Sequence, residues 1–391
     1  MSEDYLTVLL EALAYARERD YVGWDKHDGM SSRIRRALPV ETKWTNLAFQ
    51  ETVKRAPVNL RPLFLVEQRP SPKGLSLFSM AALNAAGLTD AGDFGSEARS
   101  LLDRVLSHDL AEYDGFCLSH NHELQGLKRK KPLGNPGVVA TSFGVKALLR
   151  GADLDPSYPG RARTVTEYVE SELSPDRSGV GTRLDYKPTD DAEVYTVNAN
   201  AIAARMFVDL YAHFGDDSYR DTAEQILTYV ASRQDDSGGW YYTDPPSASH
   251  ISMDNYHNGF IVESFLRYRE VVDGRAFEQT VDRALSFYRH TLYEDDGAPC
   301  WDETKAYPRD VHAAAQGVVT FSHAGRHEFA ERVLEWTLEN LHAGDGRFYY
   351  QKRKHFTKRF TLMRWCQAWM SFALSEFLVT SPEHQVPLAR A

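Results

Sequence analysis

Apolar residues recur at helical spacing along most of the chain. Four leucines between residues 6 and 13 lie on one face of a helix predicted over residues 3–19. Further helices are predicted over residues 44–55 and 75–86, and the second is rich in Ala and Leu, which favours burial. Strand-like stretches are short, as at 240–242 and 347–350. The pattern therefore predicts an all-α protein.

From about residue 96 a two-helix unit repeats. An amphipathic helix leads into an acidic turn with glycine and an aromatic residue, and a polar cluster then opens a second helix rich in small residues. The turns lie roughly 50 to 70 residues apart, near the range of stacked repeats. The first helices are predicted at 97–107, 161–173, 219–233, 277–292 and 327–341. The second helices are predicted at 138–150, 199–213, 256–270, 311–324 and 363–378.

This repetition predicts a ring. One helical hairpin cannot bury its apolar face alone, so neighbouring hairpins must stack. The small residues of the second helices suit an inner ring, and the charged first helices suit an outer one. We expect a single domain over residues 1–391 with the fold of an (α/α)6 toroid, in which N-terminal helices within residues 1–95 close the ring and repeated hairpins fill 96–380. An open solenoid is the alternative. The turn glycines are expected to end the first helices with a positive φ, and the turn aromatics, Trp240 and Trp301 among them, to plug the joins.

Charge and cysteine content narrow the function. The chain has 55 acidic and 45 basic residues, a net charge of -10, which argues against nucleic acid as a partner. Its three cysteines are scattered singly, which favours a reducing compartment. Acidic residues precede the first apolar run, unlike a secretory signal, and no stretch is apolar enough to span a membrane. We therefore expect a cytoplasmic protein.

Polar clusters at the starts of the second helices are the strongest functional signal. In a toroid these helix ends face one bowl, so clusters from separate repeats converge there, where the helix ends attract anionic groups. His257 and His312 lie about one turn into their helices, where no cap is needed, and an imidazole can move protons near neutral pH. The alternative is a buried His bonded to a backbone carbonyl.

Carboxylates and a phenol complete the predicted catalytic group. Asp254 and Asp310 could be helix N-caps, catalytic carboxylates, or both. Such a pair could also hydrolyse a glycoside if the carboxylates were close enough. Tyr256 could exchange a proton if a nearby cation lowered its pKa. The predicted catalytic residues are Asp254, Tyr256, His257, Asp310 and His312.

A basic set inside an acidic chain predicts an anionic ligand. Arg61, Lys73, Lys352 and Arg364 could hold a uronate or phosphate. The loop at 23–29 is rich in polar and aromatic residues that a hydrophobic core does not require. The predicted substrate-binding residues are Trp24, Asp25, Asn59, Arg61, Lys73, Asn200, Gln316, Tyr350, Lys352, Arg364, Trp365 and Gln367. No zinc motif or glycine-rich phosphate loop is present, so we predict neither a metal nor a cofactor.

Several motifs together resemble the VpsJ-like polysaccharide-biosynthesis family over nearly the whole chain. They are Trp24-Asp25 with Gly29, Asn59 to Pro62, Pro72 to Gly74, Asp254 to Phe260, Asp310 to His312 with Gln316, Tyr349 to Lys352, Met363 to Trp365, and Gln367 to Trp369. The resemblance implies a helical toroid in cell-surface polysaccharide or glycan assembly, with assembly proteins as possible partners. Residues 119–122 depart from the family, because they are His-rich where an aromatic-rich turn is expected. The toroid also resembles that of sugar epimerases, glycosidases and uronate lyases.

These observations predict a protein that binds a sugar or oligosaccharide, expected to be anionic, in the bowl. Acid/base chemistry at a sugar carbon, as in an epimerase or lyase, is the first choice. A glycoside hydrolase with an Asp pair is the second. A glycan-binding scaffold without catalysis is the alternative from another class.

Overall fold

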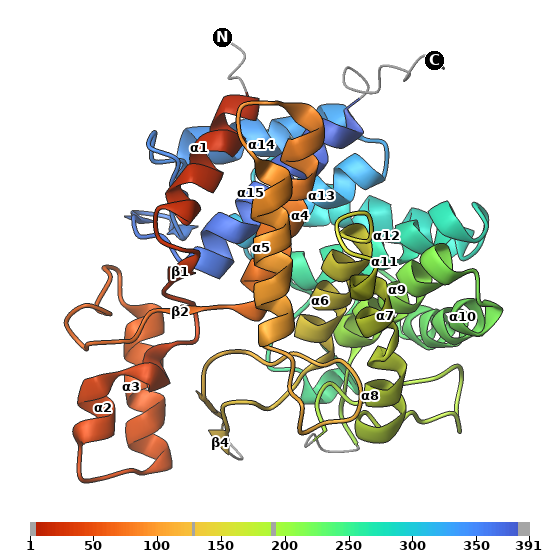
Figure 1. Ribbon diagram of the computed structural model, residues 1–391, viewed down its shortest axis with the longest axis horizontal. Coiled ribbons are helices and arrows are strands. Elements are labelled where there is room, and N and C mark those ends of the chain that lie inside the picture. Colours follow the sequence, from red (N-terminus) through yellow and green to blue (C-terminus); the bar gives the residue numbers. More distant parts are fainter. Residues whose placement is uncertain (1–4, 127–129, 189–192, 382–391) are drawn as a thin grey trace.

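The computed structural model describes residues 5–126, 130–188 and 193–381 (Figure 1). In this part of the chain six long helices form an inner ring, in which each packs on the next and the last, α15, packs on α4. This closure confirms the (α/α)6 toroid and excludes an open solenoid. The inner helices are α4 (Pro72–Leu88), α6 (Val138–Arg150), α9 (Val197–Phe214), α11 (Asn255–Val271), α13 (Val311–His323) and α15 (Trp369–Thr380), which the π-helical turn η3 (Met363–Ala368) precedes.

The outer helices are amphipathic and cover the ring. They are α1 (Tyr5–Arg17), α5 (Phe94–Ser107), α7 (Ser157–Arg163), α8 (Val165–Glu172), α10 (Asp217–Ser232), α12 (Glu278–Thr291) and α14 (His327–Leu341). The helix predicted over residues 161–173 is divided, because α7 ends at Arg163 and α8 begins at Val165. Residues 3 and 4, predicted to open the first helix, lie outside the described residues.

The turn glycines have a different role from the one predicted. Gly115 has a φ of 68° but lies well after the end of α5, so it does not end that helix. A Cβ on Gly115 would meet the Thr164 carbonyl oxygen at 2.0 Å, and one on Gly346 would meet the Glu11 carbonyl oxygen of α1 at 2.5 Å. These glycines let each turn touch the next outer helix, and the last turn touches the first helix of the chain.

Polar side chains near the start of four inner helices hold the turns in place. The amide of Asn200 accepts a hydrogen bond from the Leu184 N–H (2.7 Å) and donates one to the Leu184 carbonyl (3.1 Å). Asn258 makes the same two bonds with Trp240, at 2.8 and 3.1 Å. Thr141 and Gln367 have the same role in their own repeats. Buried backbone groups of the turns are thereby satisfied.

One cluster of buried hydrophobic side chains extends from Val8 to Leu378. The described strands are pairs of residues that link loops at the rim: β1 (Val22–Gly23) with β2 (Arg69–Pro70), β3 (Leu124–Gln125) with β4 (Lys130–Lys131), β5 (Tyr195–Thr196) with β6 (Thr243–Asp244), and β7 (Arg309–Asp310) with β8 (Gln351–Lys352) and β9 (Thr357–Lys358). A short 3₁₀ turn, η2 (Pro246–Ala248), follows β6. None of the helices described here is long and apolar enough to cross a membrane, and the cytoplasmic location stays a prediction.

Residues 29–70 form an arm that projects from the ring, at the lower left of Figure 1. The arm contains η1 (Gly29–Ser31), α2 (Arg33–Ala37) and α3 (Lys43–Arg55). Helix α3 packs mainly on η1 and β3. Of the N-terminal helices, α1 and α4 both pack on α15 of the ring, whereas α3 belongs to the arm.

Candidate functional site

Asp254 and Asp310 occupy the same N-cap position on neighbouring inner helices but make different contacts. The Asp310 carboxylate caps α13, because it accepts a hydrogen bond from the His312 N–H (2.9 Å). It also accepts bonds from Trp365 Nε1 (2.8 Å) and Gln351 Nε2 (2.5 Å). The Asp254 side chain does not cap α11, so its interpretation as an N-cap is wrong. Both carboxylates are buried.

The Asp254 carboxylate instead orients His257. Its Oδ1 lies 2.8 Å from His257 Nδ1, and its Oδ2 has no hydrogen-bond partner. Because a carboxylate accepts, Nδ1 carries the proton and donates, which leaves the Nε2 lone pair of a neutral His257 free. The His257 side chain is 16% exposed. Asp254 and His257 therefore form a dyad whose free nitrogen can take a proton.

His312 is buried among rings without a hydrogen bond. Neither ring nitrogen has a partner, and the residue is 2% exposed. Its ring centroid lies 4.4 Å from those of both Trp365 and Trp369. Burial, followed by the charges of Lys73 and Arg364, holds the pKa of His312 well below its ordinary value, so the imidazole is neutral at pH 7. The expected alternative, a His bonded to a backbone carbonyl, is not what the structure contains.

Tyr256 lies between the two histidines. Its ring centroid is 4.1 Å from that of His257 and 4.6 Å from that of His312. Burial, followed by Asp254 and Asp310, raises the pKa of Tyr256 well above its ordinary value. Tyr256 therefore stays protonated, and the expected lowering of its pKa by a cation is wrong. The pKa of Tyr350 is also raised, by burial first.

Two buried lysines beside these rings have no carboxylate partner among the described residues. Lys26 Nζ lies 3.6 Å from the Trp365 ring centroid, and Lys73 Nζ lies 4.1 Å from that of Phe143. Burial lowers the pKa of Lys26 to about 8 and that of Lys73 well below its ordinary value. Lys26 was not among the predicted residues, although the loop at 23–29 was singled out. A cation without a counter-ion beside a neutral histidine is suited to an anionic group.

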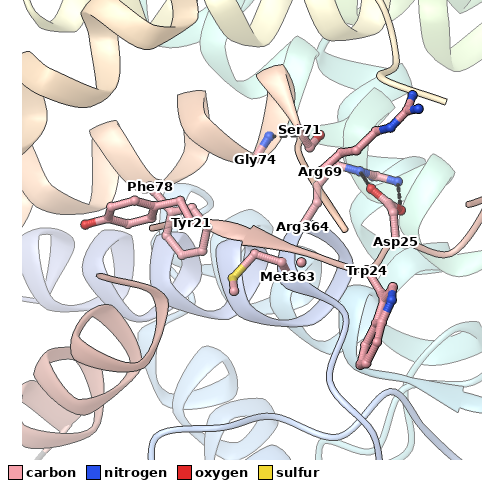
Figure 2. A pocket seen from close by; sticks show the side chains of 10 residues that line it. Tyr21, Trp24, Asp25, Arg69, Ser71, Gly74, Phe78, Met363 and Arg364 are labelled. Atoms are coloured by element: carbon pink, nitrogen blue, oxygen red, sulfur yellow. Dashed lines mark hydrogen bonds and ion pairs between the residues drawn. The ribbon is translucent and has the colours of Figure 1, made fainter. Parts of the chain in front are cut away.

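Arg61 and Arg364 were predicted to hold an anion with Lys73, but internal ion pairs occupy both. Arg61 Nε lies 2.8 Å from Asp28 Oδ2, and Arg61 is 1% exposed. Figure 2 shows Arg364 bound through two nitrogens to Asp25, at 2.6 Å each, beside a pocket that Trp24 also lines. Burial would raise the pKa of Asp25, but Arg364 overcomes this and holds it well below its usual range.

The remaining predicted binding residues also make internal contacts. Asn200 and Gln367 hold turns, and Gln316 donates to Glu263 Oε2 at 3.0 Å. Asn59 accepts from the Arg61 N–H, Trp24 donates to the Val66 carbonyl, and Lys352 donates to the Asn340 side chain. Tyr350 packs against Phe360. Of the predicted binding set, Lys73 and Trp365 are the ones beside the histidines. In the described ranges no three His, Cys, Asp or Glu side chains are placed to hold a metal ion.

The two tryptophans predicted as plugs differ. Trp240 is 1% exposed and donates to the Val230 carbonyl at 2.8 Å, so its structural role is confirmed. Trp301 is half-buried, and its ring centroid lies 6.0 Å from Lys26 Nζ. Trp301 therefore lies at the edge of the site.

The fold is similar to that of several carbohydrate-active toroids. The structure matches cellobiose 2-epimerase from Bacillus thermoamylovorans with a TM-score of 0.63 and 12% identity, over 79% of this chain and 87% of that one. It matches a D-mannose isomerase with a TM-score of 0.62 and 9% identity, over 80% and 88% of the two chains. It also matches an unsaturated glucuronyl hydrolase specific for heparin with a TM-score of 0.59 and 12% identity, over 95% of each chain.

At these identities the similarity shows the fold and not the reaction. The sequence matches no family model and no curated protein. The (α/α)6 toroid is therefore shared with epimerases, isomerases and glycoside hydrolases, whereas the VpsJ-like assignment stays a prediction.

Proposed function

We propose that this protein is a carbohydrate-processing enzyme that moves a proton at a sugar carbon, as epimerases and isomerases do. The observation that carries the proposal is the Asp254–His257 dyad, which lies across Tyr256 from the neutral, unpartnered His312. A base that a carboxylate orients, with its other nitrogen free, is what proton removal and return require. The shared fold with a cellobiose 2-epimerase and a D-mannose isomerase supports the same reaction class.

In this mechanism the dyad starts the reaction. His257 Nε2 takes the proton from the carbon next to the carbonyl of an open-chain sugar, and Asp254 stabilises the resulting imidazolium. The electron pair of the broken C–H bond moves onto the carbonyl oxygen, giving an enediolate. The Lys26 ammonium provides positive charge beside this oxygen. The His257 imidazolium then returns the proton to the enediolate, and which face of the enediolate receives it decides between epimer and starting sugar.

We further propose that the substrate is an anionic sugar or oligosaccharide. Lys26 and Lys73 are buried lysines for which the described residues supply no counter-ion, so a carboxylate or phosphate on the substrate would pair with their ammonium forms. The motifs that resemble the VpsJ-like family support a role for this reaction in surface polysaccharide or glycan biosynthesis, in which assembly proteins would be its partners.

Glycoside hydrolysis is the second candidate. It is favoured by the match to the glucuronyl hydrolase over 95% of each chain and by the unpartnered Oδ2 of Asp254. Against it, Asp310 already accepts three hydrogen bonds and has little capacity left for a water or a sugar oxygen. Proton transfer by the histidines therefore accounts for more of the geometry.

Isotope exchange tests the proposal. The purified protein is incubated in D₂O with neutral disaccharides and with uronate-containing oligosaccharides, and deuterium at the sugar carbon is followed by mass spectrometry and NMR. We expect exchange, with a preference for the uronates, and a loss of about 10²- to 10⁴-fold in His257→Gln. His213→Gln is the matched control, because His213 is exposed at the far end of α9.

Three outcomes contradict the proposal. Exchange that is unchanged in His257→Gln would remove the dyad from the reaction. New reducing ends without deuterium would assign the protein to the glycoside hydrolases. Binding of a glycan, seen as a rise in melting temperature without either reaction, would leave a scaffold.

A further inference from the structure

The arm, residues 29–70, exposes hydrophobic side chains that the rest of the chain buries. Among the described residues ten large hydrophobic side chains are exposed, and seven of them lie on the arm: Ile34, Leu38, Val40, Trp44, Val58, Leu63 and Leu65. Two more, Leu133 and Phe356, lie on loops whose lysines hold the arm. Lys130 pairs with Glu41 at 3.1 Å, and Lys358 Nζ donates to the carbonyls of Lys54 and Arg55. The exposed apolar surface is therefore concentrated in one region, which indicates an interaction site.

The end of the arm carries the bulkiest of these side chains. Leu38, Val40 and Trp44 lie in and beside the turn between α2 and α3, and they are 43%, 57% and 69% exposed. In Figure 1 this turn lies at the end of the arm away from the ring. A Trp beside aliphatic residues at a projecting end can enter an interface between water and an apolar medium without moving the ring.

The arm is also basic, although the chain is acidic. It contains eight Lys and Arg residues and three Glu residues, a net charge of +5 in a chain of net charge -10. Each Glu is shared by at least two bases, as Glu67 is by Arg33, Arg36 and Arg69. The side chains of Arg33 and Arg55 are 72% and 77% exposed. Apart from the buried Arg61, which pairs with Asp28, and the buried Arg35, the basic side chains of the arm therefore lie around the same residues that expose apolar surface.

We propose that the arm docks on an anionic lipid surface. Apolar side chains with a Trp at a projecting end, ringed by Arg and Lys, match the headgroup boundary of a membrane, where the rings and aliphatic chains enter and the cations remain with the phosphates. Charge complementarity selects this partner over a neutral bilayer. The arm begins just after Lys26 and ends just before Lys73, so docking through it keeps the proposed site at the membrane.

Vesicle sedimentation tests the docking without any assay of catalysis. The full chain is mixed with vesicles of phosphatidylcholine alone and with vesicles that also contain phosphatidylglycerol. We expect binding to the anionic vesicles only, and weaker binding as salt is raised. The tip variant Val40→Ser/Trp44→Ser and the charge variant Arg33→Gln/Arg55→Gln should each bind at least about tenfold more weakly.

Matched controls come from the same chain. Val180 is the one other exposed large hydrophobic residue of the described chain, at 58%, and Arg177 is an exposed Arg beside it, with its side chain 57% exposed. Val180→Ser and Arg177→Gln should bind as the unaltered protein does. Because all the altered side chains are exposed, we expect melting temperatures to change little, and circular dichroism checks this.

Two results overturn the proposal. The first is absence of binding to anionic vesicles, or binding that the tip variant retains. The second is self-association of the unaltered protein that the tip variant abolishes, with no vesicle binding by either. Light scattering after size-exclusion chromatography detects the second case, in which a second copy of the chain covers the arm.

Discussion

Two groups of buried charges along the inner helices of this toroid differ in how their charges are compensated. The first is the candidate site at the N-terminal ends of the inner helices, where Lys26 and Lys73 face aromatic rings and have no carboxylate partner in the part of the chain that the structure describes. The second lies farther along the same helices and contains Lys146, Arg205 and Glu263. These three occupy the same position, eight residues after the first residue of α6, α9 and α11.

The second group contains a carboxylate that pairs with both of its bases, although burial still lowers the pKa of Lys146 to about 7. Glu263 pairs with Arg205 at 2.5 Å and with Lys146 at 3.8 Å. Farther along, Glu376 of α15 pairs with Arg150 at 2.7 Å and with His323 at 2.9 Å. These pairs link neighbouring inner helices, or inner helices two positions apart in the ring. We call this group the ion-pair cluster.

This difference distinguishes buried charges that stabilise the fold from buried charges that could bind a ligand. Burial of a charge has a desolvation cost, which an ion-pair partner offsets. A buried charge without a partner lowers stability, so its presence indicates a role other than folding. In the ion-pair cluster, removal of one partner should weaken folding. At the site, removal of a lysine should relieve a cost of folding and remove function.

The largest expected effect on stability comes from the ion-pair cluster. Glu263→Gln leaves Arg205 and Lys146 buried without a full counter-charge, so the free energy of unfolding should fall by about 3–5 kcal/mol. Urea denaturation measures this. Glu270→Gln on the same helix is the control, because its side chain is 65% exposed and its pair with Arg267 contributes little. A loss below about 1 kcal/mol in Glu263→Gln would contradict the structural role of the cluster.

A pH-dependent effect of about 3 kcal/mol is expected from Lys26. Its pKa in the folded protein is about 8, below the ordinary value of 10.5. Between these two values the unfolded chain binds the proton and the folded chain does not, so stability rises with pH across that window. The Lys26→Met variant has no titrating group at this position, so it lacks this pH-dependent contribution to stability. The unaltered protein should therefore gain stability relative to the variant as pH rises from about 8 to about 10.

Urea denaturation of the unaltered protein and of Lys26→Met at both ends of the window measures this difference. The other titrating groups contribute equally to the stability of both proteins, so their contributions cancel in the difference. A relative stability that does not change with pH would contradict the lowered pKa, because it would show that the folded protein keeps Lys26 protonated throughout.

The smallest effects test where the site ends and its scaffold begins. Asn200→Ala and Asn258→Ala each remove one side chain that holds a turn, and each should cost about 1–3 kcal/mol because buried backbone groups lose their partners. Only Asn258 also donates to the Asp254 carbonyl, at 2.9 Å. Deuterium exchange should therefore fall in Asn258→Ala and stay unchanged per folded molecule in Asn200→Ala. Equal deuterium exchange in both variants would show that Asn258 does not position Asp254 for the reaction.

The site could be predicted only in part. His257, His312 and Asp254 of the candidate site were singled out because each opens a helix in a repeated unit, and the toroid brings such helix ends together. Lys26 was missed because it lies in a loop without periodicity. Asn200 and Arg61 were predicted as ligand contacts because polar residues in a predicted bowl look alike in sequence, whether they face a ligand or satisfy a turn or a carboxylate.

The sequence by itself determined the ring. Periodic apolar positions, small residues on alternate helices and recurring turns leave stacked hairpins as the way to bury the helices, and the boundaries of α6 and α14 agree with the predicted 138–150 and 327–341. Only the tertiary structure decided which charges are paired, because the partners Asp25 and Arg364, or Glu263 and Arg205, are far apart in the chain. Pairing depends on distances of a few ångströms between side chains, which no local pattern of residues encodes.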